Sequence, residues 1–169
     1  MADSKTPILS HQKIVQKINR MAYQIYEDNY DQKEIIIAGI ANNGFILAQL
    51  ISQKLKEISP ISINLVELKI NKKNPINSEV ELNITDNDIK NKSIVLVDDV
   101  QNSGRTMIYG LQHFLKAPIK KLSIAVLVDR SHKRFPVQAD YVGVSLATTL
   151  KEHVEVSFDD ANNYSAYLC

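Results

Sequence analysis

The stretch that decides the fold is Ile94-Val95-Leu96-Val97-Asp98-Asp99-Val100-Gln101-Asn102-Ser103-Gly104-Arg105-Thr106. Its first four residues are apolar, which is typical of a strand buried on both faces in a parallel sheet. Two adjacent acids end this strand, and small polar residues with one glycine lead from them into a helix. The stretch therefore predicts a buried strand, a polar turn and a helix in immediate succession.

Further strands are predicted on both sides of this stretch. Dense or alternating apolar residues indicate strands at Glu34–Ile40, Ile61–Ile70, Ser93–Val97, Leu122–Val128 and Tyr141–Leu146. A short return strand is expected at Val80–Ile84, and weaker edge strands at Val154–Phe158 and Tyr164–Leu168.

Three helices with one apolar face are predicted between these strands. The first runs from a cap at Ser10 to about Asp28. The second follows Ala41–Gly44 and stops at Ser59-Pro60, because proline disfavours helix in the residue before it. The third is closed by Pro118 and has an apolar face made of Met107, Leu111, Phe114 and Leu115.

Strands that alternate with helices at this spacing imply right-handed crossovers, so we expect an α/β fold with a mostly parallel twisted sheet flanked by helices. Ligands of such sheets bind beyond the carboxyl ends of the strands. The loops after Ile40, Val97 and Val128 should therefore share one crevice.

Composition places the chain among ordinary globular proteins. Its 169 residues fit one domain, 1–169, and 44% apolar with 23% charged residues excludes a disordered chain. The only cysteine, Cys169, allows neither an intrachain disulfide nor a cysteine metal site. No apolar run is long enough to span a membrane and the first ten residues lack a signal peptide, so we expect a cytoplasmic protein. A net charge of +1 argues against a surface that binds nucleic acid all over.

The polar turn suggests a site for a sugar phosphate. The start of a helix exposes unpaired amides and the positive end of its dipole, so Ser103–Thr106 can surround a phosphate. Asp98 and Asp99 can accept hydrogen bonds from neighbouring ribose hydroxyls. Helix capping alone could explain the turn, but two adjacent like charges favour a function. Neither a P-loop nor a dinucleotide-binding glycine fingerprint occurs in the chain.

At these residues the chain resembles the type I phosphoribosyltransferases, whose loop for phosphoribosyl pyrophosphate (PRPP) has the pattern of Val95–Val100 and Ser103–Thr106. The resemblance extends through Ala125–His132 and Phe135–Gly143 to the pyrimidine-operon attenuator proteins that are also uracil phosphoribosyltransferases. It covers nearly the whole chain, and it implies a Rossmann-like sheet with a small hood.

The resemblance implies a role for each part of the crevice. Asp98 and Asp99 would hold the ribose hydroxyls, and Asn102, Ser103, Gly104, Arg105 and Thr106 would hold the 5′-phosphate. Ala41, Asn42, Asn43 and Gly44 match the pyrophosphate loop. The base would contact Val128, Asp129 and Arg130 or Tyr141–Gly143, although a buried strand and a polar turn explain these segments equally well. The implied cofactor is Mg²⁺ carried by PRPP, with no direct metal ligand, and the implied assembly is a homodimer.

Four departures from the family pattern bear on activity. Ala41 and Asn43 stand where the attenuator proteins usually have Lys and Arg, which leaves the charge of the pyrophosphate mainly to Mg²⁺. Asn102 replaces the acidic residue of purine-specific members, so a purine acceptor is less expected. The flexible loop, Lys69–Asn91, contains lysines but no arginine, and Gln101 replaces an apolar residue.

Two functions remain open. The first is a Mg²⁺-dependent phosphoribosyltransferase that transfers ribose 5-phosphate from PRPP to a nucleobase, with uracil the favoured acceptor. The alternative is a regulator that senses PRPP or a nucleotide with little or no catalysis and that attenuates pyrimidine genes on RNA. Lys116–Arg134 has six basic residues, but a solvated charged turn is the favoured interpretation of this segment.

Overall fold

The computed structural model describes residues 5–76 and 79–169 of the chain. Its central sheet has six strands in the order β4-β3-β2-β5-β6-β7. Neighbouring strands from β3 to β7 run parallel, and only β4 pairs antiparallel. The bounds are Ser62–Lys69 for β3, Glu81–Leu82 for β4, Glu34–Ile40 for β2, Ser93–Gln101 for β5, Lys121–Asp129 for β6 and Tyr141–Ser145 for β7. The expectation of a mostly parallel α/β sheet is confirmed.

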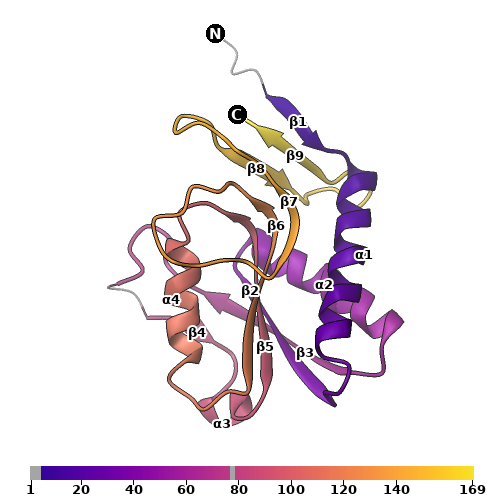
Figure 1. Cartoon of the computed structure of the whole chain (residues 1–169), viewed down its shortest axis with the longest axis vertical. Helices are drawn as coiled ribbons and strands as arrows, with labels where there is room; N and C mark the ends of the chain where they lie inside the picture. The colour runs from indigo at the N-terminus through magenta and orange to yellow at the C-terminus, as the bar shows by residue number, and fades with distance from the viewer. Residues whose placement is uncertain (1–4, 77–78) are drawn as a thin grey trace.

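Helices cover both faces of this sheet (Figure 1). On one face lie α1 (His11–Asp28) and α2 (Asn43–Ile58), and on the other lies α4 (Arg105–Phe114). Alternate residues of each central strand enter the two cores: Ile35 and Ile37 pack with α1 and α2, whereas Ile36 and Ala38 pack with α4. The dense isoleucine run of β2 is therefore explained by burial on both faces.

A second, three-stranded antiparallel sheet forms the hood above the carboxyl edge of the main sheet (Figure 1). Its strands are β1 (Thr6–Leu9), β9 (Ser165–Leu168) and β8 (Val154–Ser157), in that order. The two strands predicted as weak edge candidates thus belong to a separate sheet and not to the main one, in which β8 is an edge strand and β9 is the central strand. The sequence Thr6–Leu9 was not predicted as a strand, because it has four residues and includes a proline.

Most predicted strand bounds differ from the observed ones by one or two residues, and four differences are larger or concern whole features. β5 continues past Val97 to Gln101, because Val100 and Gln101 still pair with β6. α2 begins at Asn43, inside the turn expected before it. Leu115 is 66% exposed, because α4 ends at Phe114 and buries Met107, Gly110 and Phe114 instead. The short helix α3 (Asp86–Ile89) was missed, although Thr85 and Asp88 form a capping box at its start.

Within the described ranges, no helix combines the length and the apolar character needed to cross a membrane.

Candidate active site

The candidate site lies at the carboxyl edge of the parallel strands, where the chain leaves β2, β5 and β6. Asn43 Nδ2 donates to Asp99 Oδ2 (3.1 Å), which joins the loop after β2 to β5. Arg134 N–H donates to Ser103 O (2.8 Å), which joins the loop after β6 to the turn after β5. The three loops therefore meet at this edge, but the loop after β2 lines neither of the two cavities described below, so a crevice shared by all three stays a prediction.

Asp98 and Asp99 lie in the last part of β5 and not in the loop after it. Their carboxylates accept from the next main-chain amides: Asp99 N–H donates to Asp98 Oδ1 (3.0 Å) and Val100 N–H to Asp99 Oδ1 (2.9 Å). Asp98 is buried, whereas Asp99 is partly open to solvent. Because side chains alternate along a strand, the two acids face opposite sides of the sheet edge.

Burial raises the pKa of Asp98 to about 8, and the charge of Asp99 acts in the same direction. The ammonium group of Lys72, whose Nζ lies 3.3 Å from Asp98 Oδ2, acts in the opposite direction and is the weaker influence. Burial therefore favours the neutral form of Asp98, whereas Lys72, a bound cation or a hydroxyl donor favours its ionised form.

Lys72 is one of the lysines of the loop expected to close over the substrate, and its contact with Asp98 was not predicted. It belongs to the polar loop after β3, and its side chain is 45% exposed. Of the three lysines at 69, 72 and 73, only Lys72 makes an ion pair in the part of the chain that the structure describes. Its partner is 26 residues away, so the pairing depends on how the loop folds back over β5.

The turn after β5 forms a small cavity suited to an anion. Gly104 is the N-cap of α4 and has φ +82°, a conformation that a residue with a side chain rarely adopts. In the described chain the amides of Gly104, Thr106 and Met107 have no hydrogen-bond partner, while Arg105 N–H donates to Ser103 Oγ (3.3 Å). The cavity has a volume of about 70 Å³, and its lining includes Lys72, Asp98 and residues 100–107. Unpaired amides at a helix start are a binding site for phosphate.

The loop after β2 approaches β5 closely. Gly44 has no space for a side chain, because a Cβ there would lie 2.8 Å from Asp98 Oδ1 and 2.9 Å from Val97 O. Ala41 N–H donates to Leu68 O (3.0 Å), and the Ala41–Asn42 peptide bond is cis. Asn42 is exposed and makes no side-chain capping bond. This loop therefore brings its main chain, and no cation, to the acids.

Asn43 links this loop to the hood. Besides its bond to Asp99, its Nδ2 donates to Val156 O of β8 (2.8 Å). Asn43 thus uses both hydrogens of its side-chain amide in hydrogen bonds within the protein.

A wider cavity of about 570 Å³ lies beside the phosphate turn. It is lined by the loops after β5, β6 and β7, with four basic or ring-nitrogen side chains at its wall: Arg130, His132, Lys133 and Arg134. Asn102 and Ser103 line both this cavity and the smaller one. The two cavities are therefore adjacent compartments, as a sugar phosphate and an attached group would require.

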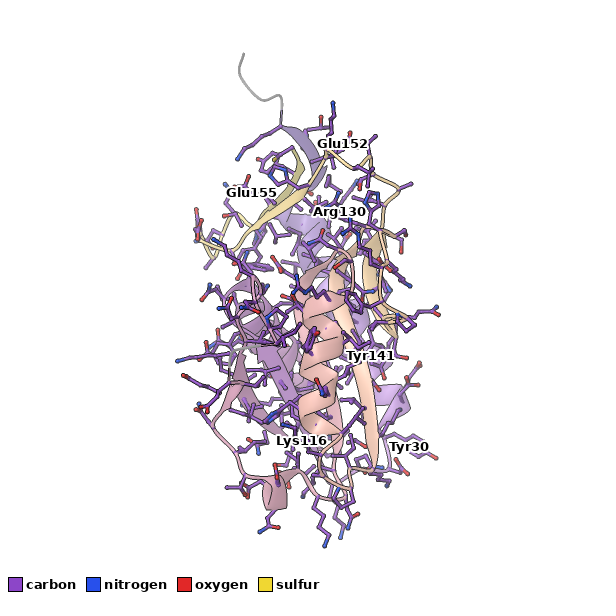
Figure 2. The ribbon with its side chains drawn as sticks, turned by 90° about the vertical axis from the view of Figure 1, so that its left-hand side faces the viewer. Tyr30, Lys116, Arg130, Tyr141, Glu152 and Glu155 are labelled. Carbon is purple, nitrogen blue, oxygen red and sulfur yellow. The ribbon has the colours of Figure 1, made fainter. Side chains whose placement is uncertain are left out.

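Arg130 joins the loops that line the wider cavity through hydrogen bonds. It is 8% exposed, and its Nε donates to Thr148 Oγ1 (3.1 Å) while Nη2 donates to Thr149 O (3.3 Å) and to Glu152 O. Nη1 donates to Asn102 Oδ1 (2.8 Å). Figure 2 shows Arg130 close to Glu152, beneath the hood strands.

Comparison with known proteins gives the family of this chain. A model described as a phosphoribosyl transferase domain matches residues 4–161. The chain belongs to the phosphoribosyl transferase family. It is 37% identical over 152 residues to the bifunctional protein PyrR of Streptococcus mutans, and the match covers 86% of each chain. It is 31% identical over 165 residues to the bifunctional protein PyrR of Macrococcus caseolyticus, with 94% of this chain and 95% of the relative covered.

Solved structures show the same phosphoribosyltransferase fold. A hypoxanthine-guanine phosphoribosyltransferase from Bacillus anthracis has a TM-score of 0.70 at 21% identity, covering 85% of this chain and 84% of that one. The hypoxanthine phosphoribosyltransferase of Trypanosoma cruzi has a TM-score of 0.76 at 15% identity, with 96% of both chains covered. At these identities the likeness concerns the fold alone.

The three residues expected to contact the base, Val128, Asp129 and Arg130, lie in different surroundings. The side chain of Val128 is fully buried in the core beneath α1 and α2. The Asp129 carboxylate accepts a hydrogen bond from Ser131 N–H (2.9 Å) and so stabilises the turn that follows β6. Of the three, only Arg130 lines the wider cavity.

Tyr141 was expected near the base, and the structure contradicts this. It begins β7, whereas the carboxyl end of that strand is Ser145, which pairs with Asp129. The Tyr141 hydroxyl donates to Asp28 Oδ2 (2.7 Å) at the end of α1, and Figure 2 shows it well below Arg130. Because β7 runs parallel to β6 and Tyr141 is its first residue, Tyr141 lies at the edge opposite to the carboxyl ends that form the site.

The donor set fits a magnesium ion carried by the substrate. Mg²⁺ binds through one or two carboxylates together with substrate phosphates and retains several waters. The site offers Asp98 and Asp99, and in the described residues no group of three or more His, Cys, Asp or Glu side chains could hold a metal ion alone. Asp98 lines the cavity of the phosphate turn and Asp99 faces the other side of the sheet edge, so either carboxylate would hold the ion only together with a phosphorylated ligand.

Proposed function

We propose that this chain transfers ribose 5-phosphate from PRPP to uracil. The observation that carries the proposal is the adjacent acid pair of β5, placed immediately before a turn whose amides at Gly104, Thr106 and Met107 are unpaired in the described chain. These amides suit the 5′-phosphate, and the acids suit the two ribose hydroxyls.

In this reaction the bond between the anomeric carbon and the pyrophosphate oxygen breaks, and a bond to a ring nitrogen of the base forms. The proton of that nitrogen leaves to water. Positive charge develops on the ribose ring, and the ionised carboxylates of Asp98 and Asp99 stabilise it. Mg²⁺ bound to PRPP would neutralise part of the negative charge of the departing pyrophosphate. The loops hold the two reactants in contact, which supplies much of the remaining rate.

We expect Lys72 to stabilise the pyrophosphate leaving group of this reaction. Ala41 and Asn43 bring no cation to the pyrophosphate loop, and Lys72 is the lysine that reaches Asp98. If Asp98 held a ligand that carries Mg²⁺, the ammonium group of Lys72 would be free to interact with a phosphate of that ligand.

The choice of uracil is supported by the resemblance to the attenuator proteins and by the relatives named PyrR. Asn102 also favours it, because an amide cannot take a proton from a purine as a carboxylate can. On the resemblance alone we further propose a homodimer in the cytoplasm.

The test is calorimetry of PRPP binding with and without Mg²⁺. We expect Mg²⁺-dependent binding that falls at least ten-fold when Asp98→Asn and Asp99→Asn are combined, because both ribose contacts and the metal contacts weaken. Inorganic phosphate, which has no ribose hydroxyls, serves as the ligand that reports the phosphate turn alone. Unchanged PRPP affinity in the double variant would refute the site.

A regulator is the second candidate function, and the missing cations at Ala41 and Asn43 favour it. Release of pyrophosphate from PRPP, measured with uracil, cytosine, adenine, guanine and hypoxanthine, separates the two. Turnover with any base excludes a sensor without catalysis. PRPP binding without turnover, together with RNA affinity that falls steeply with salt, would establish the regulator instead.

A further inference from the structure

We propose that His132 is a catalytic residue of this site, whose Nδ1 accepts the ring N–H proton of the incoming base and passes it on to water. This inference rests on the function proposed above and deepens it, because that reaction releases one proton for each bond that forms to a ring nitrogen. It names the group that receives this proton first.

The first step concerns the groups that line the wider cavity. A base joined to the ribose enters this cavity, because Asn102 and Ser103 line both it and the smaller one. Amide and hydroxyl groups are very weak bases, and arginine and lysine side chains already carry their protons at neutral pH. Among the lining residues this leaves the imidazole of His132, and imidazole is the group that most often moves protons in enzymes.

The second step concerns which ring nitrogen of His132 is free. Nε2 contacts the main-chain oxygen of Thr148, which has no hydrogen to donate, so we assign the proton of the neutral ring to Nε2. Nδ1 then carries the lone pair. In the described chain Nδ1 has no hydrogen-bond partner and is not sealed off from solvent, so it is available to a ligand.

The third step concerns what holds the ring in place. Thr148 Oγ1 lies 3.4 Å from His132 Nε2 and accepts from Arg130 Nε (3.1 Å), which fixes the loop after β7 against the ring. On the other side, Ser131 has φ +58°, an uncommon conformation for a residue with a side chain, and its N–H donates to Asp129 Oδ1 (2.9 Å). Both loops therefore orient the imidazole, and strained backbone of this kind is typical of functional sites.

The chemical consequence is a proton transfer that accompanies the bond changes at the anomeric carbon. The bond from this carbon to the pyrophosphate oxygen breaks, the bond to the ring nitrogen forms, and the proton of that nitrogen moves to His132 Nδ1. The resulting imidazolium then gives the proton to water. Without an acceptor, the nitrogen would keep its proton and become positive beside a ribose ring that is itself developing positive charge.

The test measures pyrophosphate release with uracil and with 5-fluorouracil in the wild type and in His132→Gln. Glutamine keeps an N–H donor for Thr148 but has no basic nitrogen. We expect kcat with uracil to fall about 100-fold, while PRPP affinity measured by calorimetry changes less than about two-fold. The ring N–H of 5-fluorouracil is more acidic and depends less on an acceptor, so its kcat should fall only about ten-fold. His153→Gln, the same change at an exposed position before β8, serves as control and should alter none of these values.

The pH profile of kcat separates proton transfer from support of the loop. Over about pH 5–8 the wild type should gain activity as the imidazole loses its proton, and His132→Gln should lack this gain. Asp98, whose pKa burial raises to about 8, titrates in both proteins, so the role is measured as the difference between the two profiles. The charged side chains around the ring are also the same in both: Arg130, Lys133, Arg134 and Glu152. Profiles of equal shape, or equal losses for the two bases, would refute the role.

The wild type separates this inference from the proposed function. Absence of pyrophosphate release from the wild type with uracil would refute the function, and the role of His132 with it. Release that His132→Gln leaves unchanged would refute the role of His132 alone and leave the function standing.

Discussion

The carboxyl group of Asp98 is buried at the end of β5, between the charge of Asp99 and the ammonium group of Lys72. At the scale of single residues, the site combines groups that are costly to bury with main-chain donors that the protein leaves unused. Such groups are stabilised when a ligand supplies the missing partners. The chemistry of the site can therefore be tested one residue at a time.

Asp98 should make the protein less stable as the pH rises. Its pKa is raised from 3.8 in the unfolded chain to about 8, so between these values the folded state binds more protons than the unfolded state. The free energy of unfolding should therefore fall from about pH 4 to pH 8, and this fall should be reduced in Asp98→Asn. Urea denaturation at pH 5, 6, 7 and 8 measures the difference between the two proteins. Parallel curves would contradict the raised pKa.

Asn43→Arg should increase turnover with PRPP and uracil. An arginine at this position brings a cation to the pyrophosphate loop, and a charged donor to developing negative charge contributes more than a neutral one. We expect kcat to rise at least ten-fold. Asn43→Gln is the matched control, because it lengthens the side chain without a charge. An equal rise in both variants would show that the lost contacts to Asp99 and Val156 matter, and not the charge.

At the scale of elements, the site depends on how closely α2 approaches β5. Its first turn passes over the strand at Gly44, where a Cβ would collide with Val97 O and with the carboxylate and Cα of Asp98. Two of these three atoms belong to the main chain, which cannot move aside without disturbing the sheet. The glycine therefore sets the distance between the pyrophosphate loop and the acid pair.

Gly44→Ala should weaken PRPP binding at least ten-fold and lower the free energy of unfolding by about 1–3 kcal/mol, as overpacking does. Gly110→Ala is the control, because a Cβ there would meet only the ends of the Leu96 and Leu68 side chains, at 3.0 and 3.3 Å. Calorimetry and urea denaturation on both variants separate the two effects. If Gly110→Ala also lost PRPP affinity, the close approach at Gly44 would not be the cause.

At the scale of the whole molecule, two features are considered: the distribution of basic residues over the surface and the packing of the hood on the main sheet. The six basic residues of Lys116–Arg134 do not form one patch: Lys120 and Lys121 lie at the amino edge of the sheet, near Gln32 and Asp28, and Arg130 is buried at the carboxyl edge. The nine residues of β6 separate these ends by roughly 30 Å. This segment therefore gives no continuous basic surface for RNA.

We propose that the hood and the main sheet form one cooperative unit over residues 1–169. Val156, Phe158 and Ala166 of the hood region belong to the same core as α1, α2 and β2, and Asn43 joins the hood to the site. Small domains with one shared core unfold as a whole.

Phe158→Ala should therefore destabilise the entire protein by about 3–5 kcal/mol, because Phe158 is 6% exposed and packs edge-on against Tyr164. Amide hydrogen exchange should accelerate by the same factor in peptides from β8 and β9 and in those from β5. Tyr23→Ala, at a position that is 52% exposed on α1, serves as control and should change neither. Faster exchange confined to the hood would instead indicate two separate units.

From the sequence alone, the strands β2, β3, β5, β6 and β7 and the helices α1, α2 and α4 could be predicted, because their apolar periodicity and caps are local properties. The acid pair and the phosphate turn were found for the same reason, since they lie within nine residues, Asp98–Thr106. Only the tertiary structure decided that Lys72 meets Asp98, that Arg130 holds Asn102 and that Tyr141 lies at the opposite edge from the site. These contacts join residues 26, 28 and 113 positions apart, and such pairings depend on strand order and packing, which no local pattern encodes.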